Sequence, residues 1–241
     1  MKKTSLVLLS LAVAGAVSAR DLHTAEEHLV TPLEVSLWTP LQLTSPARNV
    51  YGLRWNIFYG ENFNVYGVDV GLSGYAFNNI GGLQASAFNW VDGNMAAIQL
   101  GGLANVVNAN ADGIQFGGLV NYTRGEFRGL QLGSLLNCDG EFCGVQLATF
   151  NYVNGASMGV QLGVANSAVS EFHGWSCGLV NYAERMHGLQ LGVINAINES
   201  GRGVQIGLCN AAAQFAGVQI GLFNIIGNGA LPIMVIANAQ F

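Results

Sequence analysis

The residues able to carry acid, base or nucleophilic chemistry are few and widely spaced. The histidines are His23, His28, His173 and His187. In a chain that reverses at every repeat, His173 and His187 would fall at opposite rims of neighbouring strands, too far apart for one site. The sequence brings no acid, base and nucleophile together, as a catalytic site requires. We therefore expect no catalytic residues and no cofactor, and the protein is not expected to be an enzyme.

The cysteines are Cys138, Cys143, Cys177 and Cys209. They form no CxxC pair and have no clustered histidines beside them, so we expect no metal site. Cys138 and Cys143 bracket the Asp139-Gly140 dipeptide. They would face each other across a four-residue turn but not across a two-residue turn, which leaves a disulfide between them as an open possibility.

A repeat of about 15 residues fills most of the chain, and each copy reads glycine, apolar, glutamine, apolar, glycine, as in GVQIG. Strict alternation of polar and apolar residues is typical of a β-strand whose two faces see different surroundings. The opening positions are Gly52, Gly67, Gly82, Ala97, Gly113, Gly129, Gly144, Gly159, Gly174, Gly188, Gly203 and Gly217.

One polar row runs through the centres of the repeats. Its members are Arg54, Asp69, Gln84, Gln99, Gln115, Gln131, Gln146, Gln161, Gln190, Gln205 and Gln219, with Ser176 in the ninth copy. We expect Arg54 and Asp69 to form an ion pair because adjacent repeats set them side by side. The apolar residues on either side of each glutamine form the opposite face.

Turn signals separate the repeats, with Asp92-Gly93, Asp139-Gly140 and Asn154-Gly155 resembling type I′ hairpins. Hairpins predict antiparallel strands. The residue after the repeat asparagine is aromatic in every second copy, and the aromatic set that we expect at a membrane interface is Trp90, Tyr122, Tyr152, Tyr182 and the terminal Phe241. These features predict an all-β protein, an antiparallel transmembrane β-barrel of about 14 strands, with the polar row facing its lumen and the apolar row facing lipid.

The composition agrees with a surface that faces lipid or with repeats that stack on one another. Apolar residues make up 51% of the chain and charged residues only 10%, against roughly 25% in ordinary soluble domains. The net charge of -5 and the absence of a basic run argue against a nucleic-acid partner.

The N-terminal residues predict export. We expect a signal peptide over residues 1–19, a polar leader over residues 20–32 and a single repeat-built β domain over residues 33–241. The predicted location is the outer membrane, with the lipid bilayer and the barrel-assembly machinery as partners. The sequence does not indicate an oligomeric state.

A parallel β-solenoid of 15-residue coils is the alternative fold, because an asparagine recurs at one corner of the repeat, as at Asn166, Asn195 and Asn210. In this fold the apolar stripe would form the core, and the glutamines and asparagines would stack into ladders. The barrel would act as a passive pore or structural surface protein with a glutamine-lined lumen. The solenoid would act as a secreted or surface module for adhesion or binding. An outer-membrane hydrolase is a remote third possibility.

The stretches VYGLRWNIFYGENFNVYGVDVGL and GLVNYAERMHGLQLGVIN resemble a family of uncharacterised bacterial surface-repeat proteins with a GxQxGxxN-type repeat. The resemblance covers nearly all of the chain after residue 19 and implies an outer-membrane address. It brings no activity and no catalytic residues. Ala97, Ala148 and the Trp175-Ser176-Cys177 segment depart from the repeat.

Overall fold

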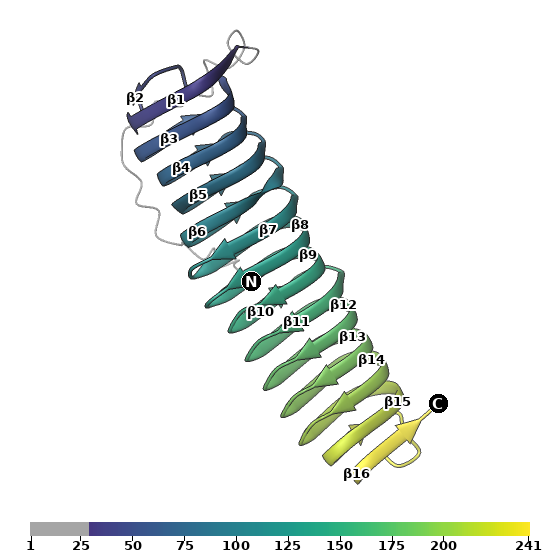
Figure 1. Ribbon diagram of the computed structural model, residues 1–241. Coiled ribbons are helices and arrows are strands. Elements are labelled where there is room, and N and C mark those ends of the chain that lie inside the picture. The colour runs from purple at the N-terminus through teal and green to yellow at the C-terminus, as the bar shows by residue number, and fades with distance from the viewer. Residues whose placement is uncertain (1–28) are drawn as a thin grey trace, which may run out of the picture.

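The computed structural model describes residues 29–241, and these form a parallel β-solenoid (Figure 1). All the strands belong to one 16-stranded sheet, and no helix occurs among the described residues. The strands of successive coils pair in parallel from β3 to β15, so the chain winds in one direction without reversing. The predicted antiparallel barrel is wrong, and the alternative solenoid is confirmed. The predicted signal peptide, His23 and His28 lie outside the described residues.

The strand bounds follow the repeat. The strands are β1 (Val30–Trp38), β2 (Leu41–Gln42), β3 (Asn49–Asn62), β4 (Val65–Ala76), β5 (Ile80–Val91), β6 (Met95–Val107), β7 (Ala111–Gly117), β8 (Val120–Gly133), β9 (Leu136–Leu147), β10 (Phe150–Val153), β11 (Ser157–Leu162), β12 (Ala165–Cys177), β13 (Val180–Leu191), β14 (Ile194–Ile206), β15 (Cys209–Ile226) and β16 (Ile233–Gln240). β1 begins at Val30, inside the predicted leader.

The two ends of the solenoid are covered differently. At the N-terminal end β1 pairs in parallel with β3, and the short β2 folds back antiparallel on β1. At the C-terminal end β16 turns back and pairs antiparallel with β15 (Figure 1). β16 therefore covers the last coil.

One repeat makes one coil, because each repeat glycine lies beside the next. Gly203 is the Cα partner of both Gly188 and Gly217. Neighbouring rungs of a sheet lie about 4.8 Å apart, so each repeat lengthens the rod by one rung. A coil has two extended runs, one carrying the glutamine and the other the asparagine. We call the link between them, such as residues 192–193, the first turn, and the link to the next repeat glycine the second turn.

The repeat glycines are required by a close backbone approach. At Gly144 φ is 145°, and a Cβ atom would lie 2.0 Å from the carbonyl oxygen of Gly129. An L-residue at that position would be strained and would also collide with the coil before it. Ala97, which fills this position in the fourth repeat, does not take the positive φ of the glycines. The sequence therefore keeps glycine where the two backbones are closest.

Two apolar columns close the interior on the side of the second turn. Two residues before the repeat glycine lie Val50, Val65, Ile80, Met95, Ala111, Phe127, Phe142, Phe172, Met186 and Phe215; two residues after the asparagine lie Val91, Val107, Val153, Ala168, Ala183, Ile197, Ala212 and Ile226. All of them are buried. Phe127 and Phe142 stack with centroids 6.3 Å apart. These columns supply the hydrophobic stabilisation of a thin rod.

The dipeptides that resembled hairpin turns lie in the second turn of the coil, where the chain passes to the next rung. Gly140 lies within β9, and the Gly155 N–H donates to the Gly140 carbonyl of the coil before it. Asx-Gly pairs permit tight turns in either architecture, so they do not report reversal of the chain. The hairpin interpretation was therefore wrong.

Candidate binding surface

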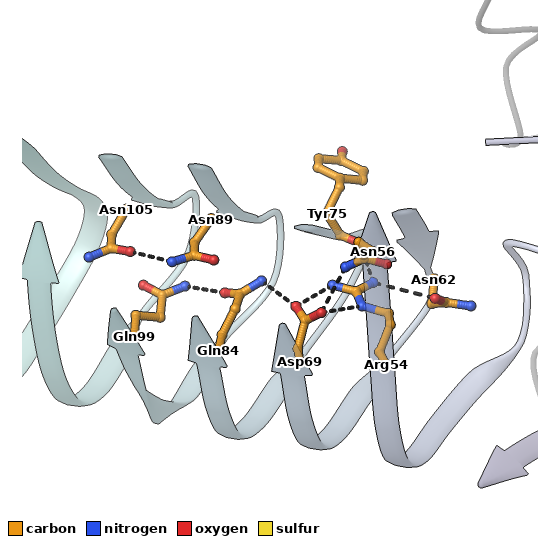
Figure 2. A network of polar contacts seen from close by, with 9 residues as sticks. All are labelled: Arg54, Asn56, Asn62, Asp69, Tyr75, Gln84, Asn89, Gln99 and Asn105. Carbon is orange, nitrogen blue, oxygen red and sulfur yellow. Dashed lines mark hydrogen bonds and ion pairs between the residues drawn. The ribbon is translucent and has the colours of Figure 1, made fainter. Parts of the chain in front are cut away.

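The predicted polar row faces inward, as expected, but into a packed interior rather than a lumen. Its side chains are at most 3% exposed, Ser176 included. Except for Gln84 and Gln190, each glutamine amide donates to the glutamine of the coil before it; Gln99 Nε2, for example, lies 2.8 Å from Gln84 Oε1 (Figure 2). The same bond joins Gln115 to Gln99, and a 3.1 Å bond joins Gln146 to Gln131. The row is a hydrogen-bonded ladder, and no pore runs through the described residues along it.

The glutamine ladder ends at a buried ion pair. The Gln84 amide donates to Asp69 Oδ2 at 2.8 Å, and Arg54 binds both oxygens of Asp69 through Nε and Nη2, at 2.8 and 2.6 Å (Figure 2). Asn56 donates to the same carboxylate, and the second Arg54 nitrogen, Nη1, donates to the Tyr75 carbonyl. The predicted Arg54–Asp69 pair is confirmed. Asp69 gives the amide of Gln84, the last of the ladder, a charged acceptor, and Arg54 neutralises that charge.

A second ladder of asparagines faces the first across the interior. Its members are Asn89, Asn105, Asn121, Asn137, Asn151, Asn166, Asn181, Asn195, Asn210 and Asn224. Each amide donates to the next asparagine, toward the C-terminus, so this ladder runs opposite to the glutamine ladder. Asn195 Nδ2 also donates to the Ile206 carbonyl at 2.9 Å. Only the solenoid interpretation of the sequence had given these asparagines a role.

Asp139 is a buried carboxyl that sequence reasoning placed in a turn. It occupies the second apolar column and is 2% exposed. Gln131 and Gln146 donate to its two oxygens at 2.9 and 2.6 Å. Burial raises the pKa of Asp139 to about 7, although the two amides act in the opposite direction. Both Asp139 and the half-buried Asp92 precede glycine, but Asp139 lies two residues after the repeat asparagine, at the buried position, and Asp92 lies three residues after it.

The outer side of the solenoid carries a continuous apolar surface, which we call the apolar edge. It comprises the outward residues of the glutamine run, the first turn and the start of the asparagine run. Examples from each part of the rod are Leu53, Trp55, Phe58, Ile98, Leu103, Phe116, Leu119, Leu135, Phe150, Val164, Leu179, Val193, Leu208, Leu222 and Phe223. Leu179 and Leu222 are 55% and 54% exposed. A contiguous exposed apolar surface of this kind marks an interaction site.

The middle of the apolar edge is hollowed because small residues occupy the first turn there. Gly101-Gly102, Gly117-Gly118 and Gly133-Ser134 line a groove of about 840 Å³. Large apolar residues form one wall of the groove, namely Leu100, Phe116, Leu132, Leu147 and Leu162. The groove follows the long axis of the rod because its lining residues recur from coil to coil.

Charged side chains gather on the opposite edge, in the second turns, which we call the charged edge. Between residues 52 and 225 the charged residues outside the interior are Glu61, Asp92, Asp112, Arg124, Glu126, Arg128, Glu141, Glu171, Glu184, Arg185, Glu199 and Arg202. All of them lie between the asparagine position and the next repeat glycine. The solenoid therefore has one apolar edge and one charged edge along its length.

The two histidines of the repeat region lie together on the charged edge. His173 and His187 occupy adjacent rungs and stack with centroids 4.8 Å apart. Glu171 Oε1 lies 2.7 Å from His173 Nε2 and 3.9 Å from His187 Nε2. The expectation that they lie at opposite rims was wrong, because it depended on reversal of the chain. Among residues 29–241 no group of three or more His, Cys, Asp and Glu side chains is arranged to hold a metal ion.

The predicted interfacial aromatics form one outward column, apart from the last. Trp90, Tyr122, Tyr152 and Tyr182 share a position in alternate coils, between the apolar edge and the charged edge; in the intervening coils the residues are Val106, Cys138 and Ser167. We call this column the aromatic row. Phe241 is 99% exposed at the chain end and does not belong to it.

Cys138 and Cys143 are free thiols on opposite sides of one second turn. Cys138 lies in the aromatic column between Tyr122 and Tyr152, while Cys143 pairs in register with Arg128 and Met158. Burial raises the pKa of the Cys138 thiol to about 11, which disfavours the reactive thiolate. Their pairing in an oxidising compartment stays a prediction.

Comparison with known proteins gives no match: no protein family, curated protein or solved structure is similar to this chain. The resemblance to surface-repeat proteins stays a prediction. In the described part of the chain there is no helix with the length and apolar character to cross a membrane.

Proposed function

We propose that this chain is an exported surface protein whose solenoid acts as a binding module, with the apolar edge as its binding surface. The observation that carries this proposal is the separation of the two edges. Large apolar side chains such as Trp55, Leu119 and Phe223 stand exposed along the whole rod, and charged side chains lie on the far edge. A protein that only needed to stay folded would gain nothing from exposing them.

The rigidity of the rod supports a binding role. The two ladders and the apolar columns fix every coil against its neighbours, so the outward side chains are presented in a preorganised array. We propose export, and placement at the bacterial surface, from the signal-peptide pattern of residues 1–19. We propose a non-catalytic role because the exposed features of the described residues are surfaces rather than convergent reactive groups.

The test compares matched substitutions on the two edges. Leu179→Ser, Val193→Ser and Leu208→Ser together remove apolar side chains from three successive first turns. Glu184→Ser, Arg185→Ser and Glu199→Ser change the charged edge of the same region. Circular dichroism is expected to be unchanged in both triple variants.

Binding to an octyl-coated matrix and to an apolar fluorescent probe provides the measurement. Wild-type protein and the charged-edge variant should bind alike, and the apolar-edge variant should lose at least tenfold in affinity. Equal binding by all three folded proteins would overturn the proposal.

A further inference from the structure

We propose that the apolar edge lies in one leaflet of a lipid bilayer, with the solenoid axis parallel to the membrane plane. This inference rests on the proposed function, in which that edge is the binding surface, and it names the partner. Three features of the apolar edge favour a lipid bilayer as the partner: its shape, the hydrogen bonding of its backbone and the residues that border it.

The apolar edge covers three sides of each coil, which favours a fluid partner over a second copy of the chain. In one coil Val204 and Ile206 face outward from the glutamine run, Leu208 projects from the first turn, and Cys209 begins the asparagine run. A rigid, straight rod could cover one of these sides. Acyl chains can cover all three and can also enter the groove lined by Gly101 and Gly117.

The backbone of the first turn suits a medium without water. The Ile206 carbonyl accepts the Gly192 N–H at 3.0 Å and the Asn195 side-chain amide at 2.9 Å. The Leu191 carbonyl likewise accepts the Gly178 N–H and the Asn181 amide. In hydrocarbon each backbone polar group must be satisfied internally. The asparagine ladder therefore supplies internal hydrogen bonds to carbonyls at the first turn. In a turn that faced water, water could supply those bonds.

The residues on both flanks of the apolar edge suit the headgroup region. The aromatic row borders the apolar edge on the asparagine side, and tyrosine and tryptophan favour the membrane–water interface because they are amphipathic. On the glutamine side the outward position before the repeat glycine holds Tyr51, Tyr66, Arg128, His173, His187 and Arg202 in six coils; the other coils hold Gly81, Ala96, Asp112, Cys143, Met158 and Ala216. The two arginines at this level can meet lipid phosphates.

The depth of insertion fits a single leaflet. Tyr182 of the aromatic row lies three positions after Leu179 at the first turn. At about 3.3 Å per extended residue the apolar edge would reach roughly 10 Å below the aromatic row, less than the ~15 Å of one hydrocarbon leaflet. The rest of the charged edge would then stay in water, as the polar face does in amphipathic helices that lie in a membrane interface.

Vesicle flotation tests the partner. The full chain and the two triple serine variants are mixed with vesicles of phosphatidylethanolamine and phosphatidylglycerol. Wild-type protein and the charged-edge variant should float with the vesicles, and the apolar-edge variant should show at least a tenfold loss of bound fraction. If wild-type protein binds the octyl matrix but not the vesicles, the bilayer inference is overturned and the proposed function stands; loss of both overturns both.

Tryptophan fluorescence tests the orientation. Two single-tryptophan proteins keep either Trp55, on the apolar edge, or Trp90, in the aromatic row, with the other tryptophans changed to phenylalanine. A nitroxide on the acyl chain should quench Trp55 more, and a nitroxide on the headgroup should quench Trp90 more. Equal quenching of the two, or a stable dimer in buffer that fails to bind vesicles, would overturn the inference.

Discussion

The glutamine ladder and the asparagine ladder occupy the same interior but end and continue in different ways. The glutamine amides point toward the N-terminus and finish on Asp69, whereas the asparagine amides point toward the C-terminus and finish on backbone carbonyls beside Asn224. The asparagine ladder is unbroken from Asn89 to Asn224. The glutamine ladder is interrupted at Ser176, whose hydroxyl donates to Asn181 instead.

The two ladders therefore have different structural roles. From Asn105 to Asn210 each asparagine bonds both to the next asparagine and to a backbone carbonyl at the first turn, so it holds the shape of the coil. The glutamines bond mainly to one another, so a missing member leaves a local gap; Gln190 Nε2 has no hydrogen-bond partner among the described residues. Because the two rows of amides point in opposite directions, their dipoles oppose each other in the low-dielectric interior.

The largest expected effect is at the charged end of the glutamine ladder. Arg54→Gln leaves the Asp69 carboxylate buried without a counter-ion, and loss of one partner of a buried pair costs about 3–5 kcal/mol. The double variant Arg54→Gln with Asp69→Gln continues the ladder without charge and should be more stable than the single variant. Urea unfolding provides the measurement. Additive losses would show that the pair is not coupled.

Asp139 gives the next effect, because its carboxyl joins the glutamine ladder without a cation. Its pKa in the folded chain is about 7, above the value of 3.8 for an exposed aspartate. The folded state thus favours the protonated carboxyl. The contribution of this carboxyl to the free energy of unfolding is complete below pH 3.8 and is lost as the pH rises toward 7. The slope is at most about 1.4 kcal/mol per pH unit and the total is on the order of 4 kcal/mol.

The free energy of unfolding, measured from pH 4 to pH 8, tests this prediction. In Asp139→Asn the fall in stability between pH 4 and pH 7 should disappear, since no proton is exchanged at that position. An unchanged slope in this variant would assign the pH dependence to another group.

A direct comparison of the ladders comes from truncating one member of each. Asn181→Ala removes the partners of Asn166, Asn195, Ser176 and the Leu191 carbonyl, so several buried groups lose a bond. A loss of roughly 2–3 kcal/mol is expected. Gln190→Ala removes one bond, from Gln205, and should cost about 1 kcal/mol beyond the lost packing. Equal thermal destabilisation of the two variants would contradict the division of tasks.

The sequence predicts the faces of the strands better than their direction. The barrel interpretation placed the glutamines inside and the apolar residues outside, and the repeat spacing set Arg54 beside Asp69. The solenoid interpretation placed the apolar stripe in the core, and that was wrong because the glutamines are buried and the apolar residues are exposed. Reversal was inferred from Asp-Gly and Asn-Gly pairs and from the alternate aromatics, none of which depends on strand direction.

Features that depend on contacts between coils were beyond the sequence. Asp139 lies two residues after Asn137, a position that becomes interior only because successive coils stack in parallel. The stacking of His173 on His187 follows from parallel register. The asparagine that recurs at one corner was the strongest sequence signal for the solenoid, since a side chain that bonds both its ladder neighbour and the backbone needs the same residue in each coil.

The smallest effect should come from repairing the gap in the glutamine ladder. Ser176 lies in register with Gln161 and Gln190, and its side chain is too short to reach either ladder neighbour. Ser176→Gln would give Gln190 Nε2 an acceptor, and one added buried hydrogen bond contributes about 1 kcal/mol. Part of this gain is offset because Asn181 loses the serine hydroxyl. A small rise in melting temperature is expected, whereas Ser176→Leu, of similar size but without an amide, should give none. If both variants stabilise the fold equally, the gap is one of packing and not of hydrogen bonding.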